Sequence, residues 1–161
     1  MEAIMSRIYL GIGSNIGDKE QNIKTAIKLV SERVGTIIIQ SSICQTAPWG
    51  FHSDNIFFNA AACVETNLTP MQVLSVIKMI EIEMGRTTKS SQGMYADRII
   101  DLDLLFYEDK VINEVMLTVP HPLLQYRMFV LLPMVEIAPD LIHPVLKMPM
   151  RELLYQLMVN E

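Results

Sequence analysis

Two segments of the chain place apolar residues at helical spacing, and each begins with a capping signal. In the first, Asp18-Lys19-Glu20-Gln21 has the form of a capping box, and Gly35 follows the last periodic residue. In the second, Thr69-Pro70-Met71-Gln72 combines an N-cap residue, a proline at the first helical position and a glutamine at the third, and Gly85 ends the period. The pattern predicts one helix between Asp18 and Gly35 and another between Thr69 and Gly85.

Short runs of apolar and β-branched residues flank these two helices. They predict strands over residues 8–12, 36–44, 57–65 and 100–107. Residues 110–119 are expected to add a hairpin arm, and residues 128–137 and 150–159 to form two closing C-terminal helices. The order β-α-β-β-α-β predicts a ferredoxin-like α+β sandwich, with helices on one face of a mainly antiparallel sheet. No repeat or linker interrupts this order, so residues 1–161 are expected to form a single domain.

Composition narrows the possible classes of protein. The 161 residues are half apolar and carry 13 basic against 18 acidic side chains, which gives a net charge of −5. This excludes a disordered chain and argues against nucleic-acid binding driven by charge. No apolar run approaches the roughly 20 residues of a membrane span. Cys44 and Cys63 lie in strand-like runs, which favours buried reduced thiols over a disulfide or a metal pair, and a cytoplasmic protein is expected.

The fourth predicted strand carries the most informative polar pair. Side chains two residues apart on a strand share a face, so Asp101 and Asp103 point the same way, about 7 Å apart at their Cα atoms. Like charges on one face repel, and a cation explains why both are held there. Mg²⁺ fits, because it binds one or two carboxylates and completes its shell with water and phosphate oxygens. A simple solvated strand face remains the alternative.

Basic residues on both sides of this strand favour the metal interpretation. Arg86, Lys89 and Arg98 precede it, and His121 and Arg127 follow it, so cations suited to polyphosphate can converge on the acidic pair. The sequence motifs of several other kinds of site are absent. Ile16 occupies the third glycine position of a dinucleotide fingerprint, and the chain contains no phosphate-binding P-loop, no nucleophile elbow and no histidines at zinc-ligand spacing.

Several motifs in this order resemble one known family, the 6-hydroxymethyl-7,8-dihydropterin pyrophosphokinases of folate biosynthesis. The resemblance runs from residue 8 to about residue 157. The motifs are Tyr9-Leu10-Gly11-Ile12-Gly13-Ser14-Asn15, Thr46-Ala47-Pro48-Trp49-Gly50, Phe58-Asn59-Ala60-Ala61, Arg98 with Asp101-Leu102-Asp103, and Thr118-Val119-Pro120-His121-Pro122.

The resemblance implies an ATP-dependent reaction. The terminal pyrophosphate of ATP would pass as a unit to the hydroxymethyl group of the dihydropterin, by in-line attack on the β-phosphorus with release of AMP. Two Mg²⁺ ions would lie between the nucleotide phosphates and Asp101 and Asp103, and Arg86 and Arg98 would join these aspartates as catalytic residues. The ATP-binding residues implied are Glu81, Arg86, Lys89, Arg98, Thr118, His121 and Arg127. The enzyme is expected to be a monomer whose product passes to dihydropteroate synthase.

The resemblance also implies a pterin pocket in which two aromatic rings, Phe57 and Phe129, stack on the bicyclic ring. The other pterin-binding positions are Gly13, Thr46, Ala47, Trp49, Asn59 and Tyr95. Without the resemblance, core packing is the simpler interpretation of both phenylalanines, a strand-edge hydrogen bond that of Asn59, and a structural role between two prolines an equal interpretation of His121.

The chain departs from the family pattern near the expected phosphate site. It carries Tyr95-Ala96-Asp97-Arg98 where many relatives have Trp-Gly-Pro-Arg, and Leu123 stands where an arginine is frequent. The loop over residues 86–98 is expected to close over bound ATP. The departures from the family pattern are expected to change the rate of the reaction and the affinity for substrates more than the type of reaction. Two other functions stay open: a catalytically weakened pterin- and nucleotide-binding module of the same fold, and a transferase that moves a single phosphoryl group and releases ADP.

Overall fold

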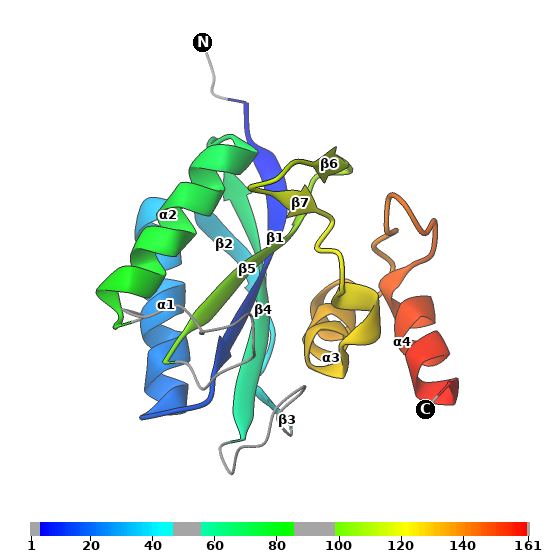
Figure 1. Ribbon diagram of the computed structural model, residues 1–161, viewed down its shortest axis with the longest axis horizontal. Helices are drawn as coiled ribbons and strands as arrows, with labels where there is room; N and C mark the ends of the chain where they lie inside the picture. Colours follow the sequence, from blue (N-terminus) through cyan, green and yellow to red (C-terminus); the bar gives the residue numbers. More distant parts are fainter. Residues whose placement is uncertain (1–3, 47–55, 86–98, 161) are drawn as a thin grey trace.

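The computed structural model describes residues 4–46, 56–85 and 99–160 (Figure 1). Its strands are β1 (Ser6–Ser14), β2 (Thr36–Gln40), β3 (Cys44–Thr46), β4 (Phe57–Thr66), β5 (Asp101–Tyr107), β6 (Ile112–Asn113) and β7 (Thr118–Val119). Its helices are α1 (Lys19–Arg33), α2 (Pro70–Glu83), the 3₁₀ turn Leu124–Tyr126, α3 (Met128–Ile137) and α4 (Met150–Val159). The two closing helices have the predicted bounds.

One antiparallel sheet organises the molecule. Its strands lie in the order β2-β4-β1-β5, and β3 adds a further pairing to β4. The helices α1 and α2 connect strands that do not pair with each other, as the split β-α-β arrangement requires. The predicted α+β, ferredoxin-like fold is therefore confirmed.

Helices cover both faces of this sheet, and the expectation of helices on one face alone is wrong. α1 and α2 lie on one side of the strands, and α3 and α4 lie on the other (Figure 1). The first side buries Ile8, Leu10 and Ile12 of β1, and the second buries Ala61 and Leu105 against α3. The strand residues between those of the first core point to the opposite face of the sheet, and they are also largely apolar. A single layer of helices would leave them exposed.

Both predicted helix starts are confirmed by their hydrogen bonds. The carboxylate of Asp18 accepts from the backbone N–H of Gln21 at 3.2 Å. At the second helix, the Thr69 hydroxyl accepts from the backbone N–H of Gln72, and the Gln72 side chain accepts from the backbone N–H of Thr69 at 2.8 Å. These bonds satisfy donors that a helix terminus otherwise leaves unpaired.

The predicted second strand is divided into β2 and β3. Its interruption at residues 41–43 has a local cause: the Ser41 hydroxyl accepts from the backbone N–H of Ala61, and the Ser42 backbone N–H and hydroxyl both donate to the Glu136 carboxylate. Side-chain oxygens of Ser41 and Glu136 thus accept hydrogen bonds from backbone N–H groups in place of the carbonyl oxygens of a neighbouring strand. The predicted hairpin arm over residues 110–119 pairs with itself, because β6 binds β7 rather than the main sheet.

A bulge in β5 changes the face on which Phe106 lies. Tyr9 of β1 pairs with Phe106, whereas Leu10 pairs with Leu104, so Leu105 is an extra residue in β5. The extra residue turns Phe106 to the face of α3 and α4, where it packs edge-on against the His143 ring at a centroid distance of 5.6 Å. Strict alternation along the strand would place Phe106 on the opposite face with Leu102 and Leu104.

Cys44 lies in β3 and is only partly buried, and Cys63 lies in β4. Cys44 and the buried Cys63 are free thiols. Within the described ranges, none of the helices is long and apolar enough to cross a membrane.

Replacement of Gly35 by alanine is expected to destabilise the fold. A Cβ atom at this position would lie 2.0 Å from the backbone oxygen of Glu65, which cannot move without disturbing β4. We expect Gly35→Ala to lower the free energy of unfolding by about 2–3 kcal/mol, measured by denaturant titration. Gly11→Ala is the matched control, because its Cβ would make ordinary contact at 3.5 Å with the Leu105 side chain. Equal losses in the two variants would contradict this prediction.

The stability of the fold is expected to depend on pH through His143. Its Nδ1 accepts from the backbone N–H groups of Val145 and Leu146 at 3.1 and 3.0 Å, and burial lowers the pKa of the ring. The folded state thus favours the neutral ring, so its contribution is present above the unfolded pKa of about 6.5 and is lost as the pH falls below it.

His143→Asn keeps an acceptor oxygen near the same place but does not titrate. Between pH 7.5 and 5.5 we expect the wild-type melting temperature to fall more than that of His143→Asn. The limiting slope for one proton is about 1.4 kcal/mol per pH unit. Burial also lowers the pKa of His121, so the difference between the two proteins isolates His143. Parallel pH profiles would exclude this role.

Candidate active site

The site is built on the face of the sheet that α3 covers. Asp101 and Asp103 lie on this face of β5, while Leu102 and Leu104 are buried on the other, so the predicted shared face of the aspartates is confirmed. In register with them on β1 are Gly13, opposite Asp101, and Gly11, opposite Asp103. Because glycines carry no side chain, the space beside the two carboxylates stays open.

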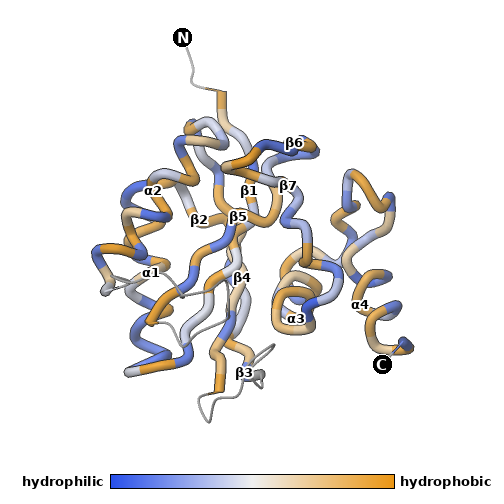
Figure 2. Tube along the Cα trace, viewed as in Figure 1, coloured by the Kyte–Doolittle hydropathy of each residue, from blue (hydrophilic) through white to orange (hydrophobic). Residues whose placement is uncertain are grey.

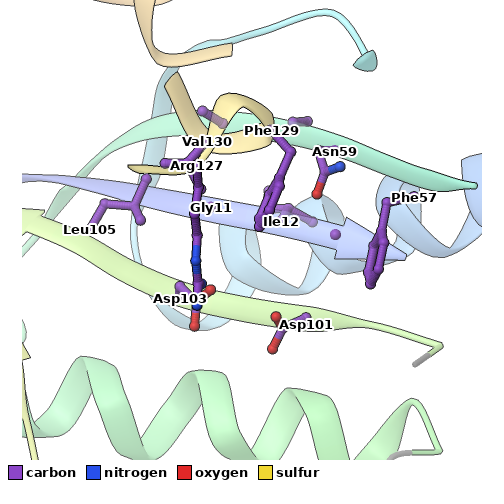
Figure 3. A pocket seen from close by; sticks show the side chains of 13 residues that line it. Gly11, Ile12, Phe57, Asn59, Asp101, Asp103, Leu105, Arg127, Phe129 and Val130 are labelled. Atoms are coloured by element: carbon purple, nitrogen blue, oxygen red, sulfur yellow. The ribbon is translucent and has the colours of Figure 1, made fainter. Parts of the chain in front are cut away.

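An aromatic slot opens beside the carboxylates (Figure 3). It is lined mainly by β1, β4, β5 and the start of α3, with Asp101, Asp103, Phe57, Asn59, Arg127 and Phe129 among its walls. The rings of Phe57 and Phe129 are nearly parallel, at 12°, with centroids 6.3 Å apart. A flat ring stacked between them needs about 7 Å, twice the usual contact distance between carbon atoms. A small outward movement of either ring would admit a flat heterocycle.

Asn59 supplies an amide to this slot. The residue is 5% exposed, and its side chain lies against Gly13, where a Cβ atom would come within 2.8 Å of the amide oxygen Oδ1. An amide can donate and accept hydrogen bonds at once, which suits the polar edge of a heterocycle. Gly13 is thus required for the close approach that positions this amide.

Arg127 brings a buried positive charge to the slot. It is 7% exposed, its guanidinium carbon lies 5.7 Å from the Phe129 ring centroid, and burial lowers the pKa of the group. Its side chain points across the strands toward Asp103 (Figure 3). The residue directly precedes α3, so Arg127 and Phe129 are positioned by the same helix start.

A second, polar cavity adjoins the same two aspartates from the edge of the sheet. Its walls come from α2, β5 and the segment from β6 to Pro122. Its polar lining side chains are Lys78, Glu81, Asp101, Asp103, Thr118 and His121. Asp101 and Asp103 therefore line both the aromatic slot and the polar cavity.

Glu81 connects α2 to the strand that carries the aspartates. Its carboxylate is buried and accepts from the backbone N–H of Leu102 at 2.8 Å. β5 is an edge strand of the sheet, so this outward N–H has no neighbouring strand to bond. Glu81, expected as an ATP contact, lines the polar cavity and also fixes the edge of the sheet.

His121 lies at the far wall of the polar cavity. Its backbone N–H donates to the Leu105 oxygen at 3.0 Å, and its Nδ1 accepts from the Leu123 backbone N–H at 3.3 Å. Burial lowers the pKa of the ring, and the charge of Asp101 opposes that shift. In the neutral ring the proton then resides on Nε2, which is available to donate to a ligand.

The structure groups the described candidate residues around the aspartates. Gly13, Phe57, Asn59, Arg127 and Phe129 lie in the slot, and Glu81, Thr118 and His121 lie in the polar cavity. The backbone of Thr46 pairs with Phe57. Outside the described residues lie Ala47, Trp49, Arg86, Lys89, Tyr95 and Arg98, together with the departures at residues 95–97.

Sequence reasoning missed Lys78 and the apolar residues Val115 and Met116, all of which line the polar cavity. Lys78 stands four residues after Leu74 and three before Glu81, which places the three on one helix face. This spacing is the feature of the sequence from which the position of Lys78 beside Glu81 could have been predicted. Val115 and Met116 lie in the turn between β6 and β7 and carry no comparable pattern.

The donor set of the aspartate pair fits a hard cation. Over residues 4–46, 56–85 and 99–160, no group of three His, Cys, Asp or Glu side chains could hold a metal ion. A pair of carboxylates facing two cavities fits Mg²⁺ bound together with a polyphosphate, since this ion binds few protein ligands and takes its other oxygens from phosphate and water.

Comparison with known proteins shows the family to which this chain is similar. The family model of 7,8-dihydro-6-hydroxymethylpterin-pyrophosphokinase matches residues 9–139. The chain is similar to the 2-amino-4-hydroxy-6-hydroxymethyldihydropteridine pyrophosphokinase of Porphyromonas gingivalis, at 38% identity over 87% of this chain and 95% of that protein. The enzyme of the same name from Aquifex aeolicus is 38% identical over 92% of this chain and 90% of that protein.

Solved structures share the fold at lower identity. The Plasmodium falciparum HPPK-DHPS structure with pterin and p-hydroxybenzoate aligns with a TM-score of 0.80 at 19% identity, over 99% of this chain. The match covers 44% of that longer chain, so this chain spans less than half of its length. From the family model and the curated relatives together, the chain belongs to the 7,8-dihydro-6-hydroxymethylpterin-pyrophosphokinase family.

Proposed function

We propose that this chain transfers the terminal pyrophosphate of ATP to the hydroxymethyl group of 6-hydroxymethyl-7,8-dihydropterin. The substrate hydroxyl attacks the β-phosphorus in line with the bond to the α-phosphate oxygen, that bond breaks, and AMP leaves. Family membership supports the reaction class. The observation that carries the proposal is the position of Asp101 and Asp103, which line an aromatic slot on one side and a polar cavity on the other.

The aromatic slot suits the pterin. Phe57 and Phe129 present two nearly parallel faces to a flat heterocycle, and Asn59 offers a donor and an acceptor to its polar edge. A ring with the wrong polar edge would leave this amide unpaired, which provides selectivity. Stacking orients the hydroxymethyl group toward the aspartates and reduces the entropy lost on the way to the transition state.

The polar cavity suits the nucleotide. Lys78 supplies positive charge, Thr118 a hydroxyl, and His121 a ring N–H toward a ligand that lies against the aspartates. Arg127 reaches the pair from the slot side, where its charge would stabilise the pyrophosphoryl group as it passes between the two cavities. Arg86, Lys89 and Arg98 are proposed to complete the phosphate contacts.

Asp101 and Asp103 would hold two Mg²⁺ ions, which neutralise the triphosphate and acidify the attacking hydroxyl when bound. The carboxylates would also exclude a misplaced phosphate by repulsion unless cations accompany it. Glu81 holds β5 in place through Leu102, so both carboxylates keep their direction during the reaction.

The proposed cellular role is a step of folate biosynthesis. Relatives named folic acid synthesis proteins and HPPK-DHPS structures support passage of the product to a dihydropteroate synthase. One chain lines both cavities, so we propose that a monomer is sufficient. The two free thiols support a reducing, cytoplasmic location.

The nucleotide product tests the proposal directly. The protein is incubated with ATP, Mg²⁺ and 6-hydroxymethyl-7,8-dihydropterin, and the nucleotides are separated by chromatography. AMP in equal amount to the pterin diphosphate is expected. ADP would instead indicate transfer of a single phosphoryl group. Binding of both ligands without turnover would indicate a module that has lost catalysis.

Asp103→Asn is expected to abolish most of the turnover. The amide keeps the size of the side chain but removes a negative oxygen ligand, so kcat should fall by roughly 10³-fold. Asp109→Asn is the matched control, because Asp109 is exposed beyond the end of β5. Initial rates at saturating substrates and a melting curve for each variant give the comparison. Near wild-type kcat in Asp103→Asn would remove Asp103 from the metal site.

Phe129→Ala is expected to weaken the pterin more than the nucleotide. Loss of one stacking face should raise the Kd of 6-hydroxymethylpterin by about 10-fold, while a non-hydrolysable ATP analogue binds as before. Tyr126→Ala controls for a nearby aromatic residue, because Tyr126 is 62% exposed. Calorimetry with each ligand makes the measurement. A larger loss for the nucleotide would reverse the assignment of the two cavities.

A further inference from the structure

Lys19 occupies a position that is unfavourable for a lysine. It is the first residue of α1, where the N-terminal end of the helix carries partial positive charge. A cation in the first turn therefore lowers helix stability, and Lys19 needs other interactions to offset this cost.

Two contacts of the Lys19 side chain compensate for this loss of helix stability, and both are made with residues at the start of β4. The Lys19 ammonium donates to the backbone oxygen of Ile56 at 3.0 Å. The same nitrogen lies over the ring of Phe58, 4.9 Å from its centroid. A charged donor and an aromatic face together hold one side chain more firmly than either contact does alone.

Lys19 thereby fixes both residues that flank Phe57. Along β4 the side chains alternate, so Phe58 faces α1, whereas Phe57 and Asn59 face the aromatic slot. The ladder thins at this end of the strand, because pairing with β1 stops at Ser14 and Phe58. Among the described residues, Phe57 pairs only with Thr46 of β3, and Ile56 lies before the strand. The contacts of Lys19 act from the opposite face of the sheet on the strand that carries one wall of the slot.

We propose that Lys19 is a positioning residue for pterin binding, which holds the Phe57 wall close to the spacing that a flat ring requires. This inference rests on the proposed function of the slot. Without the two contacts, residues 56–58 sample more conformations in the free protein, and the ligand must order them when it binds. Nucleotide binding in the polar cavity does not involve this wall.

The test compares Lys19→Met, Lys19→Arg and Lys28→Met. Methionine keeps much of the length of the side chain but removes the charge. Arginine retains a cation able to donate to Ile56 and stack on Phe58, and Lys28 is an exposed lysine on the same helix. We expect Lys19→Met to raise the Kd and the KM for the pterin about 3- to 10-fold. The kcat, the affinity for a non-hydrolysable ATP analogue and the melting temperature should stay close to wild type.

Lys19→Arg should restore most of the pterin affinity, and Lys28→Met should bind like wild type. A pterin affinity within twofold of wild type in Lys19→Met would overturn the inference. An equal loss of nucleotide affinity, or a large fall in melting temperature, would also overturn it by showing a general structural role.

Hydrogen exchange of the backbone amides of residues 56–59 gives a readout that needs no ligand. Exchange should be faster in Lys19→Met than in wild type and Lys28→Met, and unchanged exchange would contradict the inference. If the wild-type protein binds no pterin, the proposed function fails. The exchange data then still decide whether Lys19 holds this wall.

Discussion

The site depends on one constraint: an edge strand must hold two like charges on the same covered face of a sheet. Asp101 and Asp103 keep this direction because β5 is fixed on both sides, by its ladder to β1 and by the buried bond from Leu102 to Glu81. An unpaired edge would be free to twist or slip, and a slip of one residue would turn both carboxylates to the other face. The two cavities adjoin each other only while this strand keeps its register.

The two faces of the sheet divide structural and chemical roles. The face under α1 and α2 is filled by the large apolar core, whereas small residues of β1 and β4 leave room under α3 for the slot (Figure 3). Orange and blue alternate along the traces of α1 and α2, whereas the trace of α3 is mostly orange (Figure 2). A rigid core on one face thus supports an open site on the other.

The sequence predicted those features that local chemistry determines. Capping residues located α1 and α2, and alternation placed both aspartates on one face. The side covered by α3 was not predictable, because Met128–Ile137 is apolar almost all round and shows no preferred face. The extra residue Leu105 and the bond between Glu81 and Leu102 depend on contacts between distant segments, which no local pattern reports. The grouping of Phe57 with Phe129 followed only from family resemblance.

The bulge at Leu105 has a consequence for how this strand tolerates change. It divides β5 into two halves in which the side chains alternate separately. In the first half Asp101 and Asp103 face the slot, and in the second half Phe106 faces α3 and α4. Substitutions around Phe106 that adapt the packing against α4 and its preceding loop need not rotate the carboxylates. Sequence drift in α4 and the loop before it can therefore accumulate while the chemistry at the other end of the strand is conserved.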